Sequence, residues 1–222
     1  MSLPAPYYSD EGITIYCGDC REIMPEVEAD VMVTDPPYGI ALANHAPGKE
    51  RSRGSWRIAG DHTQDLGTAV LSGWLAHSAP TIAFSSPMKP WPGNWTQFLV
   101  WDKGPAVGGG GDIASTWKPT FEIVQVANLG PLEGPRDAAL LRRWMQPQEY
   151  ADHPATKPVS LLVYLIGKTR FQTVLDPFMG SGTTLVAAKQ LSRHAIGIEI
   201  EERYCEVAVQ RLAQGVLPLE AP

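Results

Sequence analysis

The chain has 222 residues, of which 44% are hydrophobic and 19% are charged, a composition typical of a globular protein and not of a disordered one. Its formal net charge of −6 argues against a protein that coats nucleic acid with a uniformly basic surface. The chain opens without the basic and apolar segments of a signal peptide, and its apolar runs are short. We therefore expect neither a signal peptide nor a membrane span.

The three cysteines agree with this expectation. An odd number of cysteines in a chain without a signal peptide favours a reducing compartment, so we expect a cytoplasmic protein. Cys17 and Cys20 form a single CxxC pair. Because no second pair and no histidine stand at the spacing of a zinc site, we expect no bound metal.

Strand-like segments alternate with helical ones along the chain. The predicted strands are 12–16, 31–34, 81–85, 98–101, 121–127, 173–175 and 195–198. The predicted helices are 64–77, 158–168, 183–191 and 202–212, with a further short helix at 137–145. Because most of the strands are apolar throughout, they predict an α/β fold with a mostly parallel sheet of about seven strands and helices on both faces. We expect a single domain over 1–222, with a surface excursion around 128–152.

One buried strand ends in an unusual way. The apolar strand 31–34 runs into Asp35-Pro36-Pro37-Tyr38. Two prolines stop the strand and offer no amide hydrogens, so the spot presents the carboxylate and carbonyl oxygens as acceptors beside an aromatic ring. A nucleobase with an exocyclic amine would fit there, although these four residues are equally compatible with a strand that ends in a rigid turn.

A basic segment follows soon afterwards, with the sequence KERSRGSWR. It holds Lys49, Arg51, Arg53 and Arg57 against one acidic residue, and the phosphates of a nucleic acid would pass here if a base entered at the preceding motif. Trp56 is suited to stack on a base. A solvated basic loop with a structural tryptophan explains the same residues.

A second motif lies near the other end of the chain. One strand ends in Asp176, a turn with Gly180 and Gly182 follows, and the strand after the next helix ends in Glu199. Such a turn lets the backbone approach a ligand, and an acidic residue in that position can accept both ribose hydroxyls. The turn is not a phosphate-binding P-loop, and Leu185 stands where the dinucleotide fingerprint needs a third glycine. These features favour a nucleoside cofactor without pyrophosphate, such as S-adenosylmethionine.

Together the motifs resemble those of the amino-methyltransferases of DNA. The matching segments, in chain order, are YCGDC at 16–20, DPPY at 35–38, HPATKP at 153–158, DPFMGSGTT at 176–184, and GIE with RYC at 197–205. The catalytic motif precedes the cofactor motif, which is the order of the group usually called β. The resemblance spans about residues 13–212.

The resemblance implies a Rossmann-like methyltransferase fold and methyl transfer from S-adenosylmethionine to the exocyclic nitrogen of a base flipped out of DNA. The catalytic residues implied are Asp35, Pro36, Pro37 and Tyr38, with Asp35 and the Pro36 carbonyl accepting the amine hydrogens and Tyr38 stacking on the base. The cofactor residues implied are Asp19, Lys157, Ser160, Asp176, Phe178, Gly180, Gly182, Thr183 and Glu199. Asp19 would face the adenine, Glu199 the ribose, and Lys157 and Ser160 the methionine carboxylate. The nucleic-acid-binding residues expected are Lys49, Arg51, Arg53, Trp56 and Arg57.

The target base and the partners follow from the same resemblance. An aspartate at the first position of the catalytic motif leans toward adenine N6, and cytosine N4 is the alternative. Methylation of RNA or of a protein glutamine is disfavoured by this aspartate and by the motif order, and an inactive binding protein is disfavoured because every catalytic position is filled. The excursion before residue 153 is short beside the target-recognition regions of many members, which favours a short or relaxed target or help from a second subunit. DNA is the expected partner, and a second copy of the chain and a cognate restriction nuclease are further possible partners in a prokaryotic or phage-host cytoplasm. The sequence leaves open a role in restriction–modification, in regulation or in phage self-protection.

Overall fold

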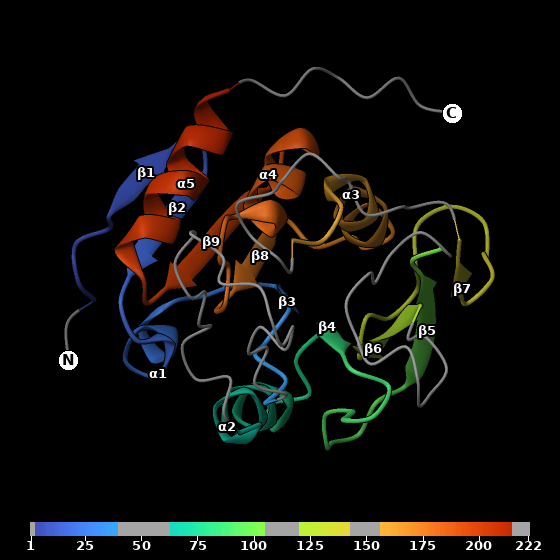
Figure 1. Ribbon diagram of the computed structural model, residues 1–222. Helices are drawn as coiled ribbons and strands as arrows, with labels where there is room; N and C mark the ends of the chain where they lie inside the picture. Colours follow the sequence, from blue (N-terminus) through green and yellow to red (C-terminus); the bar gives the residue numbers. More distant parts are fainter. Residues whose placement is uncertain (1–2, 40–62, 105–119, 143–155, 215–222) are drawn as a thin grey trace, which may run out of the picture.

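A single nine-stranded sheet organises the computed structural model, which describes residues 3–39, 63–104, 120–142 and 156–214 (Figure 1). The strand order is β1-β2-β9-β8-β3-β4-β6-β5-β7. The strands are β1 (Tyr8–Asp10), β2 (Ile13–Cys17), β3 (Val31–Thr34), β4 (Thr81–Ser85), β5 (Gln97–Asp102), β6 (Phe121–Ala127), β7 (Leu140–Leu141), β8 (Thr173–Asp176) and β9 (His194–Glu199). The helices are α1 (Cys20–Ile23), α2 (Asp65–Leu75), α3 (Val159–Gly167), α4 (Thr183–Gln190) and α5 (Glu202–Ala213), with a 3-10 turn η1 (Met24–Glu26) after α1.

The centre of the sheet is parallel. β2, β9, β8, β3 and β4 run in the same direction, whereas β1 is antiparallel to β2, and β6 is antiparallel to both β4 and β5. All four residues of β3 are buried, because helices cover both sides of it. The carboxyl ends of the parallel strands therefore meet along one edge of the sheet, where open α/β folds bind their ligands.

Helices cover the two faces of the sheet in two groups. α3, α4 and α5 lie on one face, and α1 and α2 lie on the other (Figure 1). The first layer buries a continuous cluster that includes Leu161 and Leu165 of α3, Leu185 of α4 and Ala208 of α5. The second layer buries a smaller cluster with Ile23, Val70 and Leu71. The predicted two-sided arrangement is confirmed.

All seven predicted strands and the four longer predicted helices are present, with ends that differ by two residues or fewer. The sheet is larger than predicted because β1 and β7 add short strands at its two edges. Only three and two residues long, these strands carry too little periodicity to be recognised in the sequence.

The predicted short helix at 137–145 is wrong over its described residues. Leu140 and Leu141 form β7, parallel to β5, with Leu140 opposite Val100. Leu141 is buried against the sheet, and Asp137 accepts a hydrogen bond from the Tyr164 hydroxyl at 2.8 Å. Pairing with the sheet and burial of Leu141 outweigh the local helical preference of this segment. Residues 143–145 lie outside the described part of the chain.

Candidate active site and cofactor loop

Three carboxylates predicted from the sequence lie at the carboxyl edge of the sheet. Asp35 directly follows β3, Asp176 ends β8, and Glu199 ends β9. β3 pairs with β8, and β8 pairs with β9, both in parallel. The catalytic and cofactor motifs, 141 residues apart at Asp35 and Asp176, therefore stand on neighbouring strands.

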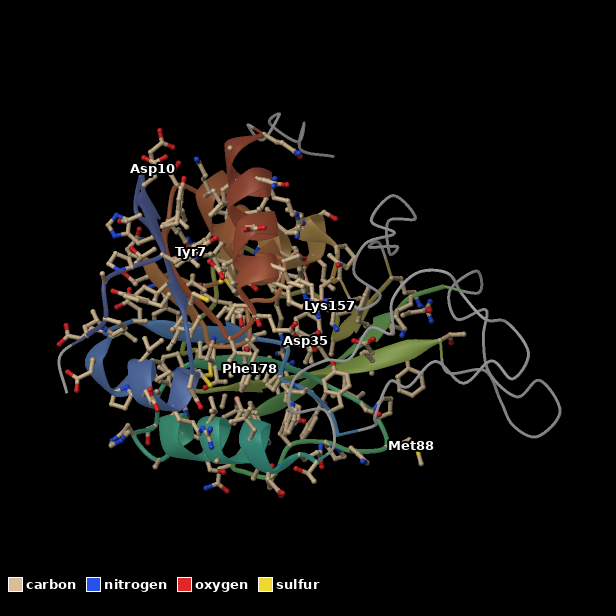
Figure 2. The ribbon with its side chains drawn as sticks, turned by 60° about the vertical axis from the view of Figure 1, so that its left-hand side comes forward. Tyr7, Asp10, Asp35, Met88, Lys157 and Phe178 are labelled. Atoms are coloured by element: carbon tan, nitrogen blue, oxygen red, sulfur yellow. The ribbon has the colours of Figure 1, made fainter. Side chains whose placement is uncertain are left out.

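The Asp35 carboxylate lies in a cluster of charged groups. Its Oδ1 accepts a hydrogen bond from the Tyr38 hydroxyl, and its Oδ2 accepts one from Lys157 Nζ at 2.5 Å. Lys157 Nζ also lies 3.1 Å from Glu122 Oε2, and Glu122 Oε1 accepts from Lys103 Nζ at 3.0 Å. Figure 2 shows Asp35 and Lys157 near the middle of the molecule. The cluster thus balances two carboxylates with two ammonium groups.

Burial and charge act in opposite directions on this cluster. Burial raises the pKa of Asp35, and the nearby Lys157 ammonium only partly offsets that effect. Burial also opposes ionisation of Glu122, but Lys157 and Lys103 outweigh it and hold the pKa of Glu122 below its ordinary value. For Lys157, burial lowers the pKa, but the two carboxylates outweigh it and keep the pKa above the usual value. Lys157 is therefore a cation at neutral pH.

Aromatic rings line the same cluster. Lys157 Nζ lies 5.2 Å from the centroid of the Phe84 ring and 5.6 Å from that of Tyr38, distances at which a cation is attracted to a ring face. The Tyr38 ring also contacts Trp91, with centroids 6.2 Å apart. The Lys157 side chain is only 8% exposed, so these rings hold its ammonium in place.

The two prolines of the catalytic motif are buried behind Asp35. They pack toward α2, where a Cβ added at Gly67 would lie 3.0 Å from Pro36 Cβ and 2.6 Å from the Trp91 ring. Only glycine leaves room for this approach, since real Cβ atoms avoid contacts so short. Helix α2 therefore supports the rigid segment that follows β3.

The loop between β8 and α4 is built on two glycines in the left-handed region. Gly180 has φ of 49° and Gly182 has φ of 78°, conformations that other residues rarely adopt. The Gly180 N–H donates to Glu199 Oε2 at 3.0 Å, and the Glu201 N–H donates to Glu199 Oε1 at 2.9 Å. A Cβ at Gly182 would lie 2.7 Å from the Cβ of Ala208. Glu199 and α5 together fix the backbone of this loop.

Arg211 of α5 braces the same loop from the other side. Its guanidinium donates to the Ser181 carbonyl oxygen at 2.7 Å and to the Ser181 hydroxyl at 2.9 Å. It also donates to the Thr183 hydroxyl at 3.1 Å, at the first residue of α4. The hydroxyl of the predicted cofactor residue Thr183 is thus fixed by the Arg211 guanidinium.

Asp176, the first residue of the cofactor motif, contacts the end of β3. It is 3% exposed, and its Oδ1 accepts from the Thr34 hydroxyl at 2.8 Å and from the Phe178 N–H at 3.2 Å. Burial raises the pKa of Asp176 to about 6, although hydrogen bonds from Thr184 and Thr34 oppose the shift. Asp176 therefore links the end of β8 to the end of β3.

Asp19 and Ser160 lie at two further helix starts. Asp19 caps α1 by accepting from the Arg21 N–H at 2.9 Å, and its carboxylate also pairs with the Arg21 guanidinium. The Gly18 N–H donates to the Glu199 carbonyl oxygen at 2.8 Å, which places Asp19 beside the end of β9. Ser160 is half-buried in the first turn of α3. The predicted cofactor residues thus follow the carboxyl edge from β2 to β8, while Lys157 lies at Asp35.

The predicted nucleic-acid-binding residues lie outside the described part of the chain, namely Lys49, Arg51, Arg53, Trp56 and Arg57. The two described residues that flank this segment are in contact, because a Cβ at Gly39 would lie 2.5 Å from the Thr63 carbonyl carbon. Gly39 directly follows Tyr38. The chain therefore leaves and re-enters the described structure next to the catalytic motif.

Sequence reasoning did not single out Glu122 or Lys103. The sequence pattern could have indicated Glu122, because it alternates with Val124 and Val126 along the same strand. In the structure these three residues share one face of β6, and both valines are buried. A lone carboxylate on a buried strand face needs a cationic partner. Only the fold identifies the partners as Lys157 and Lys103.

Metal and membrane features do not appear in the described ranges. Within them, no cluster of three or more His, Cys, Asp or Glu side chains could hold a metal ion. None of the helices described in Figure 1 is long and apolar enough to cross a bilayer.

The proteins with similar sequences are type II methyltransferases. The type II methyltransferase M.ScaI of Streptomyces caespitosus is 25% identical over an alignment of 262 residues, which covers 95% of this chain and 84% of M.ScaI. M.HindIII of Haemophilus influenzae is 52% identical over 62 residues, 27% of this chain. The chain matches only 20% of the length of M.HindIII and 24% of that of M2.LlaDCHI from Lactococcus lactis.

Solved structures share the fold. The crystal structure of the M1.HpyAVI–SAM complex has a TM-score of 0.64 at 23% identity, covering 90% of this chain and 98% of that one. PvuII DNA methyltransferase, which is cytosine-N4-specific, has a TM-score of 0.64 at 17% identity and covers 93% of this chain and 88% of its own. A family model described as DNA methylase matches residues 100–210, half of the chain. The chain belongs to this DNA methylase family.

Proposed function

We propose that the chain is a DNA methyltransferase that moves the methyl group of S-adenosylmethionine to the exocyclic nitrogen of a flipped base, with adenine N6 as the target. The observation that carries the proposal is the placement of Asp35 at the end of β3, next to the glycine loop that follows β8. An amine acceptor and a nucleoside-type loop on neighbouring strands suit two reactants that must meet. Membership of the DNA methylase family supports the same reaction.

The loop between β8 and α4 fits the proposed cofactor. Gly180 and Gly182 give the loop the left-handed backbone of a tight turn. Glu199 still has lone pairs for ribose hydroxyls beyond its backbone contacts. Asp19 is placed for the adenine end, beside the end of β9. The remaining proposed contacts are Ser160, Asp176, Phe178 and Thr183. When bound, S-adenosylmethionine supplies an electrophilic methyl group on a cationic sulfur.

The residues of the catalytic motif would prepare the base. Asp35 and the Pro36 carbonyl each accept one amine hydrogen, which draws the nitrogen lone pair out of conjugation and aims it at the methyl group. Tyr38 stacks on the ring, and this contact helps to offset the few kcal/mol that base flipping costs. The nitrogen would gain the methyl group as its bond to sulfur breaks, S-adenosylhomocysteine would be the leaving thioether, and the nitrogen would give up one proton. Asp35 is suited to take that proton, because burial raises its pKa.

Cytosine N4 is the second candidate for the target. PvuII methyltransferase, whose structure is as similar as that of M1.HpyAVI, is cytosine-N4-specific. Both bases carry an amine beside a ring nitrogen, so the chemistry at Asp35 is the same for either. The aspartate at the first motif position is the feature that favours adenine.

DNA contacts are assigned to the basic segment. Lys49, Arg51, Arg53 and Arg57 would contact phosphates, and Trp56 would stack on a base or fill the gap it leaves. The flanking contact between Gly39 and Thr63 supports this role, since it tethers the segment next to Tyr38. A second copy of the chain and a cognate restriction nuclease stay predicted partners.

Mass spectrometry of digested DNA tests the reaction and the base together. The protein is incubated with labelled S-adenosylmethionine and unmodified DNA, and the nucleosides are analysed beside those from D35A and D35N. We expect labelled N6-methyladenine from the parent, no product from D35A, and a reduced yield from D35N, because its amide oxygen still accepts one hydrogen but carries no charge.

Asp30 offers a matched control at the opposite end of the same strand. Its carboxylate accepts from the Gln172 and Thr173 N–H groups at the amino edge of the sheet, so D30A should retain product formation. Labelled N4-methylcytosine would overturn the choice of adenine. The absence of any methylated nucleoside from the parent, despite cofactor binding, would overturn the proposed function.

A further inference from the structure

Lys157, which the sequence predicts to contact the cofactor carboxylate, lies with its ammonium group at Asp35. All of its described partners lie on β3, β4 and β6 or directly after them: Asp35, Tyr38, Phe84 and Glu122. The glycine loop and Glu199 belong to β8 and β9, on the other side of β3 in the strand order. Lys157 therefore lies on the side of Asp35 that faces away from the proposed cofactor loop.

The side of Asp35 next to Lys157 is the side on which the base would lie. Tyr38 is the residue proposed to stack on the base, and its ring centroid is 5.6 Å from Lys157 Nζ. Asp35 is the proposed acceptor of the amine, and its Oδ2 is 2.5 Å from the same nitrogen atom. A base that contacts both residues brings its hydrogen-bonding edge within reach of the ammonium.

The edge of the base has a matching pattern of donors and acceptors. In adenine the N6 amine donates and the adjacent N1 accepts, and in cytosine N4 and N3 form the same pair. Asp35 and Lys157 offer an acceptor and a donor side by side, and such contacts to the Watson–Crick edge are how flipped bases are read. We propose that Lys157 donates a hydrogen bond to the ring nitrogen beside the target amine, an inference that rests on the proposed function.

The cluster allows Lys157 to make this contact without stranding a charge. An ammonium group has three hydrogens, and Asp35 and Glu122 take two of them in the described structure. When the amine engages Asp35, Lys157 keeps its contact with Glu122, whose other oxygen is held by Lys103 at 3.0 Å. Glu122 is thus a positioning residue that acts through Lys157.

The proposal is tested with a base analogue and a variant in one cycle. Duplex oligonucleotides carry the site mapped for the parent, with the target adenine either intact or replaced by 1-deazaadenine, which keeps the amine and has C–H in place of N1. A hydrogen bond to a charged donor contributes about 1.5–3 kcal/mol, or roughly 10- to 150-fold in rate. We expect the parent to prefer adenine by about that factor in kcat/KM.

Lys157→Met should remove the preference. The analogue also changes the intrinsic reactivity of the amine, but this effect is common to both proteins and cancels in the ratio of ratios. We expect K157M to have a lower kcat/KM on adenine than the parent. Its ratio of kcat/KM on adenine to kcat/KM on the analogue should reflect only the intrinsic reactivities of the two amines. Its Kd for S-adenosylhomocysteine should be unchanged. Cofactor binding also shows that K157M is folded. If K157M does not fold, K157Q, whose side-chain amide is a neutral donor, replaces it.

Lys103→Met is the matched control. It removes the other cation on Glu122, at 3.0 Å, and leaves Lys157 in place, so it should retain the preference for adenine. The proposal would be overturned if the ratio of adenine to analogue in kcat/KM were the same for K157M as for the parent. If K157M instead lost much of its cofactor affinity and kept the preference for adenine, Lys157 would be assigned to the cofactor carboxylate. Failure of the parent to methylate unmodified DNA would instead concern the proposed function.

If the mapped product is N4-methylcytosine, the same cycle uses cytosine and 3-deazacytosine. The expected and contradicting results are unchanged, because N3 of cytosine stands beside N4 as N1 of adenine stands beside N6.

Discussion

The individual carboxylates of the site differ in how the protein surrounds them. Asp35 and Glu122 are balanced by lysine ammonium groups, whereas Asp176 is buried among neutral donors, the Thr34 hydroxyl and the Phe178 N–H. A buried charge without a cation is costly to ionise. That cost explains why the pKa of Asp176 rises to about 6. Ionisation of Asp176 should therefore lower the free energy of unfolding.

Asp176→Asn should change the dependence of stability on pH. Below pH 3.8 the carboxyl group is protonated in the folded and unfolded chains alike. As the pH rises from about 4 to 6, the unfolded chain releases its proton first, so the parent loses stability, by on the order of 3 kcal/mol for a shift of about two pKa units. The asparagine keeps an acceptor for Thr34 and has no proton to release.

Thermal unfolding of the parent and D176N between pH 4 and pH 8 measures this effect. We expect the melting temperature of D176N relative to the parent to rise between pH 4 and pH 6 and then to level off. Other carboxylates titrate in both proteins and cancel in the difference. Parallel curves over the whole range would show that Asp176 is ionised as easily in the folded chain as in the unfolded one.

At the scale of elements, the loop after β8 is fixed by its neighbours. Glu199 at the end of β9 accepts from Gly180, and Arg211 of α5 binds the Ser181 carbonyl oxygen. α5 also lies so close that a Cβ at Gly182 would meet Ala208 at 2.7 Å. A loop held on both sides is preorganised for a ligand, so little ordering is needed on binding.

Gly182→Ala should therefore damage both stability and cofactor binding. The alanine would have to adopt φ near 78°, which costs roughly 1–2 kcal/mol, and its methyl group would push α4 away from α5. We expect the free energy of unfolding in urea to fall by about 1–3 kcal/mol and the Kd for S-adenosylhomocysteine to rise.

Gly73→Ala is the comparison for this substitution. Gly73 lies in α2, and a Cβ there would meet no atom within 4 Å. Because alanine favours the helix over glycine, G73A should raise the free energy of unfolding by about 0.5–1 kcal/mol. Equal effects of the two substitutions would contradict the assigned role of Gly182.

At the scale of the whole molecule, the acidic net charge and the proposed DNA substrate must be reconciled. The formal charge is −6, so attraction to DNA has to come from a local cluster. The basic segment is the strongest such cluster in the sequence, and its flanking residues Gly39 and Thr63 meet beside the catalytic motif. Phosphate contacts concentrated there would act next to the flipped base.

Replacing Arg51, Arg53 and Arg57 by alanine should weaken DNA binding and flatten its dependence on salt. Each phosphate contact contributes about 0.9 to the slope of log K against log salt, so we expect the slope to fall by about 2–3. Binding isotherms at several salt concentrations measure it. R170A serves as control, because Arg170 pairs with Glu133 at 2.6 Å and precedes β8, at the amino edge of the sheet. The same slope in the parent and the triple variant would exclude the segment from phosphate contact.

The sequence by itself determined the longer elements and the two motifs. Apolar runs such as 31–34 and 173–175 predicted buried strands because parallel strands covered on both sides cannot alternate in polarity. Asp35-Pro36-Pro37-Tyr38 and the turn with Gly180 and Gly182 were recognisable because proline and glycine restrict or free the backbone locally.

Tertiary structure alone decided which distant residues meet. The ammonium group of Lys157 lies between Asp35 and Glu122, because the order β8-β3-β4-β6 brings strands together that are far apart in the chain. Likewise β7 replaced the predicted helix because its stability comes from pairing with β5. Local patterns report backbone preferences, whereas charge pairing and edge strands depend on neighbours that only the folded sheet supplies.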